Sequence, residues 1–180
     1  ISLGLAVLVA LTACQQNRLE GATPYQLVPH NAIAIVQVND FVELSPAFDN
    51  NKILRYWKDH YSDLESTLSS LTPSQPSSGD LYVFSPQGKE TYATTYIGRK
   101  EKNDTLPNTN AKLKKYEGVQ IHQSEERIFE ATVGRLQLRS TTLLALENCI
   151  RNFTQISNQS ADPTFKNLKE SLNNGSPVNL

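Results

Sequence analysis

Strand-like segments follow one another through the middle of this chain with no helical pattern between them. They cover residues 81–84, 91–97, 118–123, 127–133 and 135–139. Their apolar residues alternate or are β-branched, and polar turns or a polar loop separate them, which is typical of antiparallel strands. The Pro and Gly of residues 85–89 are those of a hairpin connection, and short links join the last three segments. Consecutive strands favour an antiparallel sheet over alternating βαβ units.

Three helices and one more strand complete the predicted domain. Residues 33–38 are apolar on both faces and predict a buried strand. A short helical piece near 41–48 precedes a longer helix that begins at Asn50 or Asn51, with a kink near Ser62 as the alternative to a straight helix. The apolar residues at helical spacing are Trp57, Tyr61, Leu64, Leu68 and Leu71 in one helix, Leu143, Leu146, Ile150 and Phe153 in the second, and Phe165, Leu168 and Leu172 in the third. We expect an α+β domain over residues 24–175, an antiparallel sheet of about five or six strands with helices packed on one face.

The composition agrees with an ordinary folded domain. The 180 residues carry a net charge of −1, and 38% of them are hydrophobic, which argues against a disordered chain or a nucleic-acid clamp. Two cysteines are too few for a disulfide scaffold, so a hydrophobic core must supply the stability. We expect no nucleic-acid partner.

The first fourteen residues have a different character. Residues 1–13 are uncharged and apolar, too short to span a bilayer, and they end in Leu11, Thr12 and Ala13 before Cys14. This ending resembles the lipobox of bacterial lipoproteins. The resemblance implies a signal peptide at 1–13, with diacylglycerol and an N-acyl group on Cys14 and no other cofactor. Because the run lacks Met and a basic start, we expect that the signal peptide begins before Ile1.

The lipoprotein resemblance also predicts a location. Residues 14–23 form a polar tether after the lipidated cysteine, and several acyl chains on one residue anchor a protein stably to a membrane. We expect a place in the bacterial cell envelope at the outer membrane, facing the periplasm or the cell surface. Gln15, which follows the cysteine, does not itself select a membrane.

Two further motifs resemble those of uncharacterised envelope lipoproteins of Gram-negative bacteria. The first is Val28-Pro29-His30-Asn31-Ala32 before a hydrophobic strand, and the second is Asp162-Pro163-Thr164-Phe165 at a helix start. In that family another strand follows the second motif. The resemblance supports the fold and the location, and it carries no catalytic residue. We expect residues 176–180 to start a further strand or repeat.

Residues that could perform catalysis are scattered. No Gly-rich phosphate loop or nucleophile motif is present, and His30, His60 and His122 are far apart in the sequence. Asp59 and Asp63 are four residues apart, which on one helix fits either a paired-carboxylate site or a solvated face. Cys149 lies on the apolar side of the second helix, where a small buried side chain is favoured over a nucleophile. We therefore predict no catalytic residue and no metal site.

Two features of the sequence are candidate binding sites, a row of tyrosines and a pair of basic segments. Tyr92, Thr94 and Tyr96 alternate onto one face of a strand, where Tyr92 and Tyr96 would stack on sugar rings if the face is open or join the core if helices cover it. Basic residues at 99–102 and 112–115 fit an anionic partner, but interleaved acidic residues favour a solvated strand edge.

These observations leave three hypotheses for function. The leading one is a lipid-anchored, non-enzymatic interaction or scaffold module with an envelope protein or polymer as partner. The second is a lipoprotein that binds glycans or other envelope polymers through its tyrosines. The third is an envelope hydrolase whose site lies outside this chain.

Overall fold

A computed structural model describes residues 22–61, 63–88, 91–100, 113–124, 127–155 and 175–180 of the chain. The predicted signal peptide, Cys14 and nearly all of the tether lie outside the described residues. The third predicted helix, with Phe165, Leu168 and Leu172, lies outside them as well. Within the described residues, no helix is both long and apolar enough to cross a membrane.

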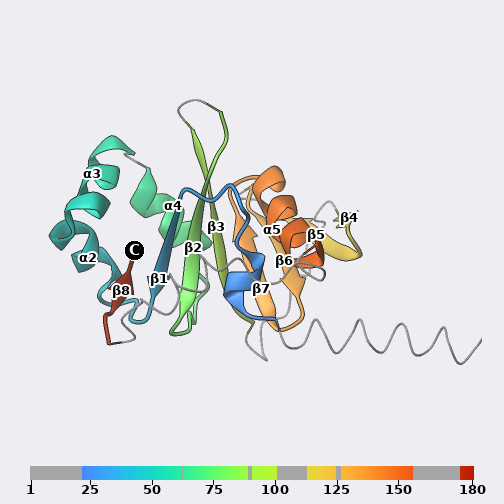
Figure 1. The fold of residues 1–180 in the computed structure, drawn as a ribbon, viewed down its shortest axis with the longest axis horizontal. Helices are drawn as coiled ribbons and strands as arrows, with labels where there is room; N and C mark the ends of the chain where they lie inside the picture. Colours follow the sequence, from blue (N-terminus) through green and yellow to red (C-terminus); the bar gives the residue numbers. More distant parts are fainter. Residues whose placement is uncertain (1–21, 62, 89–90, 101–112, 125–126, 156–174) are drawn as a thin grey trace, which may run out of the picture.

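One antiparallel sheet of eight strands organises the fold (Figure 1). The strands are β1 (Ala34–Val38), β2 (Asp80–Pro86), β3 (Tyr92–Arg99), β4 (Leu113–Tyr116), β5 (Val119–Gln123), β6 (Phe129–Val133), β7 (Leu136–Ser140) and β8 (Val178–Asn179). Their spatial order is β4-β5-β6-β7-β3-β2-β1-β8, and all neighbours are antiparallel. The predicted α+β class and the pairing of residues 81–84 with 91–97 are therefore confirmed.

The sheet has more strands than the five or six predicted. The additional strands are the two edge strands, β4 and β8. The sequence Leu-Lys-Lys-Tyr of β4 shows almost no apolar alternation, because its lysines 114 and 115 are exposed at the edge. Strand β8 has only two residues, and it pairs with Gln37 and Val38 of β1. The start of a strand predicted at 176–180 is present, as the outermost strand of this same sheet.

The helices are η1 (Pro24–Leu27), α2 (Leu44–Asn50), α3 (Lys52–His60), α4 (Leu64–Leu71) and α5 (Leu143–Gln155). Asn51 caps α3, since its side chain accepts hydrogen bonds from the backbone N–H groups of Ile53 and Leu54 at 2.9 and 3.2 Å. The prediction of one long helix is wrong, since α3 ends at His60 and α4 begins at Leu64, which is the part of the sequence where the alternative placed a kink. Tyr61 leaves the helical conformation at φ −122° and ψ 86°, and α4 begins three residues later. The apolar spacing continues across the break because both helices pack on the same sheet face.

Helices cover both faces of the sheet, so the prediction of helices on one face is wrong. Leu81 and Val83 of β2 belong to the hydrophobic cluster under α5, whereas the alternate residues Tyr82 and Phe84 belong to the cluster under α3 and α4. Successive side chains of a strand point to opposite faces, so a strand that is apolar at every position needs a cover on each side. Figure 1 shows α5 in front of the sheet and α4 behind it.

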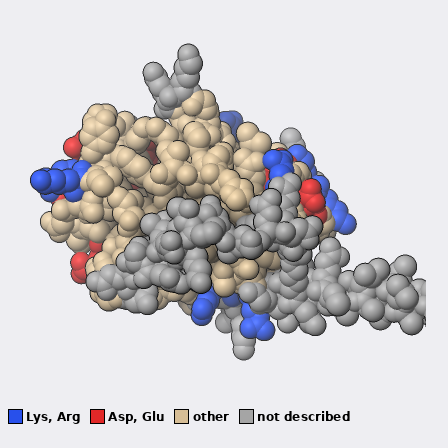
Figure 2. Space-filling view, in the orientation of Figure 1, with Lys and Arg blue, Asp and Glu red and all other residues tan. Residues whose placement is uncertain are grey.

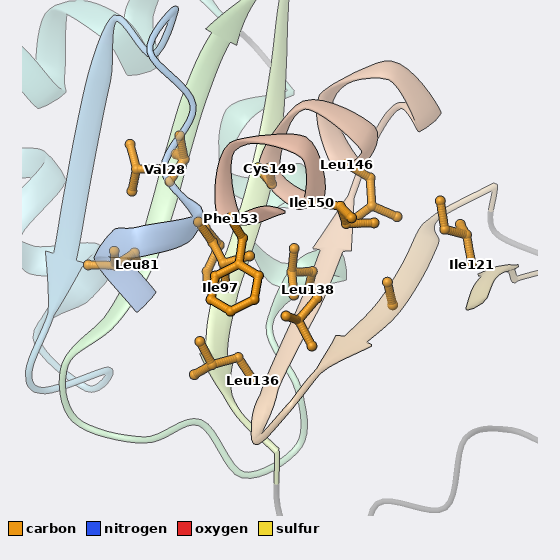
Figure 3. Close-up of a cluster of buried hydrophobic side chains, with 14 residues drawn as sticks. Val28, Leu81, Ile97, Ile121, Leu136, Leu138, Leu146, Cys149, Ile150 and Phe153 are labelled. Carbon is orange, nitrogen blue, oxygen red and sulfur yellow. The ribbon is translucent and has the colours of Figure 1, made fainter. Parts of the chain in front are cut away.

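The face under α5, called here the α5 face, is a closed apolar core. Figure 3 shows Leu146, Ile150 and Phe153 of α5 directed toward strand residues such as Ile97 and Leu138. Polar contacts hold the helix in place. The side-chain amide of Asn152 donates to the carbonyl of Val28 at 2.6 Å, and Lys114 of β4 pairs with Glu147 at 2.7 Å.

The opposite face, called here the α4 face, holds a buried polar network at its centre. The Tyr96 hydroxyl donates to the carboxylate of Asp80, which also accepts from the backbone N–H groups of Ser77 and Arg99 at 2.7 and 3.3 Å. Gly98 makes room for this arrangement, since a Cβ at that position would lie 2.1 Å from the Tyr96 hydroxyl oxygen. Burial raises the pKa of Asp80, and the hydrogen bonds from Tyr96 and the two N–H groups partly offset the shift.

Arg139 joins α4 to the sheet. Its guanidinium pairs with Glu130 of β6 at 2.9 Å and donates to the carbonyls of Leu71 and Thr72 at 3.1 Å each. These carbonyls are at the C-terminal end of α4, where helix carbonyls have no partner within the helix. The contact therefore fixes α4 over the sheet, and with it one wall of the pocket described next.

Candidate ligand-binding site

A pocket of about 400 Å³ opens on the α4 face where α3 and α4 meet the end of the β2–β3 hairpin. Both helices and strands contribute to its walls, with Trp57 of α3, Tyr61 from the break between the helices, Phe84 of β2 and Tyr92 of β3. The other described lining residues are Ile33, Asp63, Leu64, Thr67, Thr91, Thr94 and Thr141. The volume lies in the range of about 300–1,000 Å³ that is typical of small-molecule sites. We call it the aromatic pocket.

The four rings of the aromatic pocket form two corners. Tyr61 and Tyr92 are 5.1 Å apart between ring centroids with an interplanar angle of 88°, and Trp57 and Phe84 are 5.0 Å apart at 68°. Edge-to-face pairs of this kind are the favoured arrangement of aromatic rings. Hydrogen bonding with Tyr92, followed by burial, raises the pKa of Tyr61 to about 12, so its phenol stays neutral at physiological pH. Phe84 is only 4% exposed, so a ligand has access mainly to the rings of Tyr61, Tyr92 and Trp57.

The polar part of the lining consists of hydroxyls, one carboxylate and the indole N–H of Trp57. Four threonines line the aromatic pocket, and Asp63 is the only charged residue among its described lining residues. Two of the hydroxyls have partners within the protein: Thr91 donates to the carbonyl of Gln87 at 2.7 Å and Thr141 to that of Thr94 at 3.5 Å. The pocket is therefore aromatic and acceptor-rich.

The structure separates the two tyrosines that the sequence placed in one row. Tyr92 lies on the wall of the aromatic pocket and is 40% exposed. Tyr96 is on the same sheet face but is completely buried, with its ring against Tyr82 and its hydroxyl on Asp80. Tyr96 thus belongs to the core and is inaccessible to a ligand, because α4 covers the centre of this face and leaves only the hairpin end open.

Sequence reasoning missed Trp57 and Tyr61 as pocket residues. Both are on the apolar stripe of the predicted helix, and such a stripe usually indicates core packing. Each is only partly buried. The available signal was the position of Tyr61 directly before the polar residues Ser62 and Asp63, with Trp57 one helical turn earlier.

The other candidate residues do not form a site. Asp59 is on α3 and Asp63 precedes α4, so the break between the helices removes the shared helix face that was predicted for them. His30 and His60 are exposed in separate regions, and His60 packs on the ring of Tyr56. Among the described residues, no group of three or more His, Cys, Asp or Glu side chains is placed to hold a metal ion.

Cys149 is buried in the core under α5, as the sequence predicted. Burial raises the pKa of its thiol to about 12. A thiol that remains protonated at neutral pH is a poor nucleophile, and the side chain acts as a small apolar group.

Polar and charged features elsewhere are weaker candidates. In the view of Figure 2, the described Lys and Arg side chains lie around the rim of the molecule, at both ends and along the lower edge, and do not form one patch. The α4 face continues across β5–β7 with polar residues, of which His122, Thr132 and Gln137 each bury an atom that has no hydrogen-bond partner in the described part of the chain. A second hollow of about 310 Å³ lies between α2 and β8.

Comparison with known proteins adds no relative to this description. No protein-family description matches the chain, and neither the curated proteins nor the solved structures include a match to it. The chemistry of the aromatic pocket therefore has to be derived from its own residues.

Proposed function

We propose that this chain is a lipid-anchored, non-enzymatic interaction module of the bacterial envelope that engages its partner through the aromatic pocket. The observation that carries the proposal is the pocket itself, a cavity walled by Trp57, Tyr61, Phe84 and Tyr92 on a rigid sheet. Aromatic side chains provide large contact areas at small cost in conformational entropy, and they dominate binding sites for that reason.

The position of the aromatic pocket supports binding by a folded, preorganised surface. Phe84 and Thr94 face each other across β2 and β3, so the floor of the pocket is part of the paired sheet. Arg139 fixes the C-terminal end of α4 behind it. A site on paired strands and docked helices loses little freedom when a ligand binds.

The anchor in this proposal is Cys14, modified by diacylglycerol and an N-acyl group. Each buried methylene contributes about 0.8 kcal/mol, and a stable anchor needs more than one chain. The described domain begins close behind, with η1 starting at Pro24. The short spacing would keep the domain, and therefore its pocket, near the membrane surface, which we propose is that of the outer membrane.

A second candidate is the binding of glycans or other envelope polymers at the same pocket. The observation in its favour is that Tyr92 and Trp57 line the cavity, because aromatic rings stack on the apolar faces of sugars. Tyr96, the other tyrosine considered for this role, is buried and takes no part.

Site-specific crosslinking in cells tests the proposal. Tyr92 is replaced by p-benzoylphenylalanine in one strain, and Leu144, which is 56% exposed on the α5 side, is replaced in a control strain. We expect a discrete crosslinked product from position 92 that is absent or much weaker at position 144. Equal products at both positions, or none at position 92, would contradict the use of the pocket.

The anchor is tested separately with the full-length protein. We expect Cys14→Ser to move the protein from the membrane fraction to the soluble fraction and to abolish the crosslink at position 92. Unchanged membrane retention of the variant would contradict the lipoprotein assignment, whatever the crosslinking shows.

A further inference from the structure

We propose that the aromatic pocket binds a quaternary ammonium group, with the cation held in a corner of aromatic rings and balanced by the carboxylate of Asp63. This inference rests on the proposed use of the pocket for binding and adds the chemical class of the ligand. Three features of the pocket support it: the ring geometry, the charge of the lining and the lack of amide and basic side chains among its described lining residues.

The ring geometry provides the surface that a cation prefers. Tyr61 and Tyr92 meet at 88° with centroids 5.1 Å apart, and Trp57 meets Phe84 at 68°. Phe84 is only 4% exposed, so the accessible ring surface is that of Tyr61 and Tyr92, with Trp57 beside them. The face of an aromatic ring is its electron-rich side and attracts a cation within about 6 Å, and Trp and Tyr give the strongest attraction.

The charge of the lining is negative, which is complementary to a cation. Asp63 lies between Tyr61 and the start of α4, and the described lining residues include no Lys or Arg. A cation would therefore meet one carboxylate and several ring faces without a competing positive charge from these residues. The carboxylate of Asp63 would repel an anionic ligand.

Hydrogen bonding distinguishes an ammonium ligand from a sugar. A sugar exposes many hydroxyls, and each one that is buried without a partner is costly. The described lining residues contain no Asn, Gln, Arg or His, and the hydroxyls of Thr91 and Thr141 already donate to backbone carbonyls. A quaternary ammonium group has no hydrogen-bond donor, so it requires none of these partners.

The size of the pocket fits a cation carried on a larger molecule. A volume of about 400 Å³ exceeds that of a trimethylammonium group and leaves room for part of the chain that carries it. The nearby Ile33, which is 50% exposed, gives that chain an apolar surface.

The test uses the intrinsic fluorescence of Trp57, which is the only tryptophan in the chain and reports directly on the pocket. Choline is titrated against the full folded domain, and 3,3-dimethylbutan-1-ol, which replaces the positive nitrogen by carbon, is the matched neutral probe. We expect choline to bind about tenfold more tightly than the alcohol, since cation–π attraction of this size is typical of partly desolvated sites. Tyr92→Ala and Asp63→Asn should each weaken choline binding, and Leu144→Ala on the opposite side should leave it unchanged.

Other outcomes separate this inference from the proposed function. Equal binding of choline and the alcohol, or saturable binding of a neutral oligosaccharide but not of choline, would overturn the ammonium assignment and leave the pocket as a binding site. A choline response that survives Tyr92→Ala and Asp63→Asn would place the site elsewhere and overturn the inference as well. If no probe changes the fluorescence while the crosslink at position 92 forms, the ammonium proposal fails and the interaction module stands.

Discussion

The two faces of the sheet are built from the same strands but have different chemistry. On the α5 face, Leu81, Val83, Ile97 and Leu138 pack under α5 and η1, and the buried surface is closed. On the α4 face, the alternate residues Tyr82, Phe84 and Tyr96 carry rings and a hydroxyl network, and two short helices cover them incompletely. The continuous helix α5 together with η1 closes one face, whereas the break between α3 and α4 leaves a cavity on the other.

This difference suggests that the α5 face mainly stabilises the fold and that the α4 face provides the binding site. Close-packed aliphatic side chains gain most from complete burial, so the α5 face is expected to supply most of the stability. Large rings and a break at Tyr61 leave space at the hairpin end of the α4 face, where the aromatic pocket opens. If mutations on the two faces lower the free energy of unfolding equally, this difference in their roles does not hold.

The largest effect is expected from Leu138→Ala on the α5 face. Leu138 is completely buried, and removing its side chain leaves a cavity that the surrounding helix and strands cannot fill. Substitutions of this type cost about 2–5 kcal/mol of unfolding free energy. Urea unfolding followed by circular dichroism measures the loss, and Leu144→Ala on the exposed side of α5 is the control. A loss below about 1 kcal/mol would contradict a closed core on this face.

The sequence predicted the α5 face well because its signal is local. Leu146, Ile150 and Phe153 repeat at helical spacing, and the strands beneath them alternate with short turns. The number of strands and the cover of the second face depend on contacts between distant segments. No local pattern reveals that β8 will pair with Val38 of β1, although the unbroken apolar run of β2 does indicate cover on both sides.

The aromatic pocket was only partly predictable for the same reason. Tyr92 and Tyr96 have the same periodicity and differ only in what covers them, and the cover is set by where α4 ends over the sheet. Trp57 and Tyr61 had the spacing of core residues, and only the tertiary position of the helix break exposes them. Sequence periodicity identifies a face, whereas access to it depends on packing between elements.

A smaller effect is expected from Tyr96→Phe at the centre of the α4 face. The variant keeps the ring but removes the hydroxyl that donates to the buried Asp80 carboxylate. A buried acceptor that loses a partner costs about 1–3 kcal/mol. Chemical denaturation measures the change, and Tyr56→Phe, whose ring is exposed on α3, serves as the control. An unchanged stability would show that the network does not hold this face together.

The same network predicts a pH dependence that the α5 face lacks. Because burial raises the pKa of Asp80 above its ordinary value of 3.8, the folded protein keeps this proton at pH values where the unfolded chain has lost it. The Asp80 contribution to stability therefore falls as the pH rises from about 3.8 through the raised pKa, and it is constant above that window. Relative to Asp80→Asn, the unmodified protein should lose stability across this interval. Denaturation of both proteins between pH 3 and 7 measures it, and a constant difference would contradict the shift.

Tyr92→Ala is expected to have the smallest effect on folding and the largest effect on binding. Tyr92 is 40% exposed and its hydrophobic contacts are those of a pocket wall, so Tyr92→Ala should change the unfolding free energy by less than about 1 kcal/mol. The variant should keep the circular dichroism spectrum of the parent and lose ligand binding at the aromatic pocket. A loss of stability close to that of Leu138→Ala would mean that this edge of the α4 face is core, and the contrast between a face for folding and a face for binding would not hold.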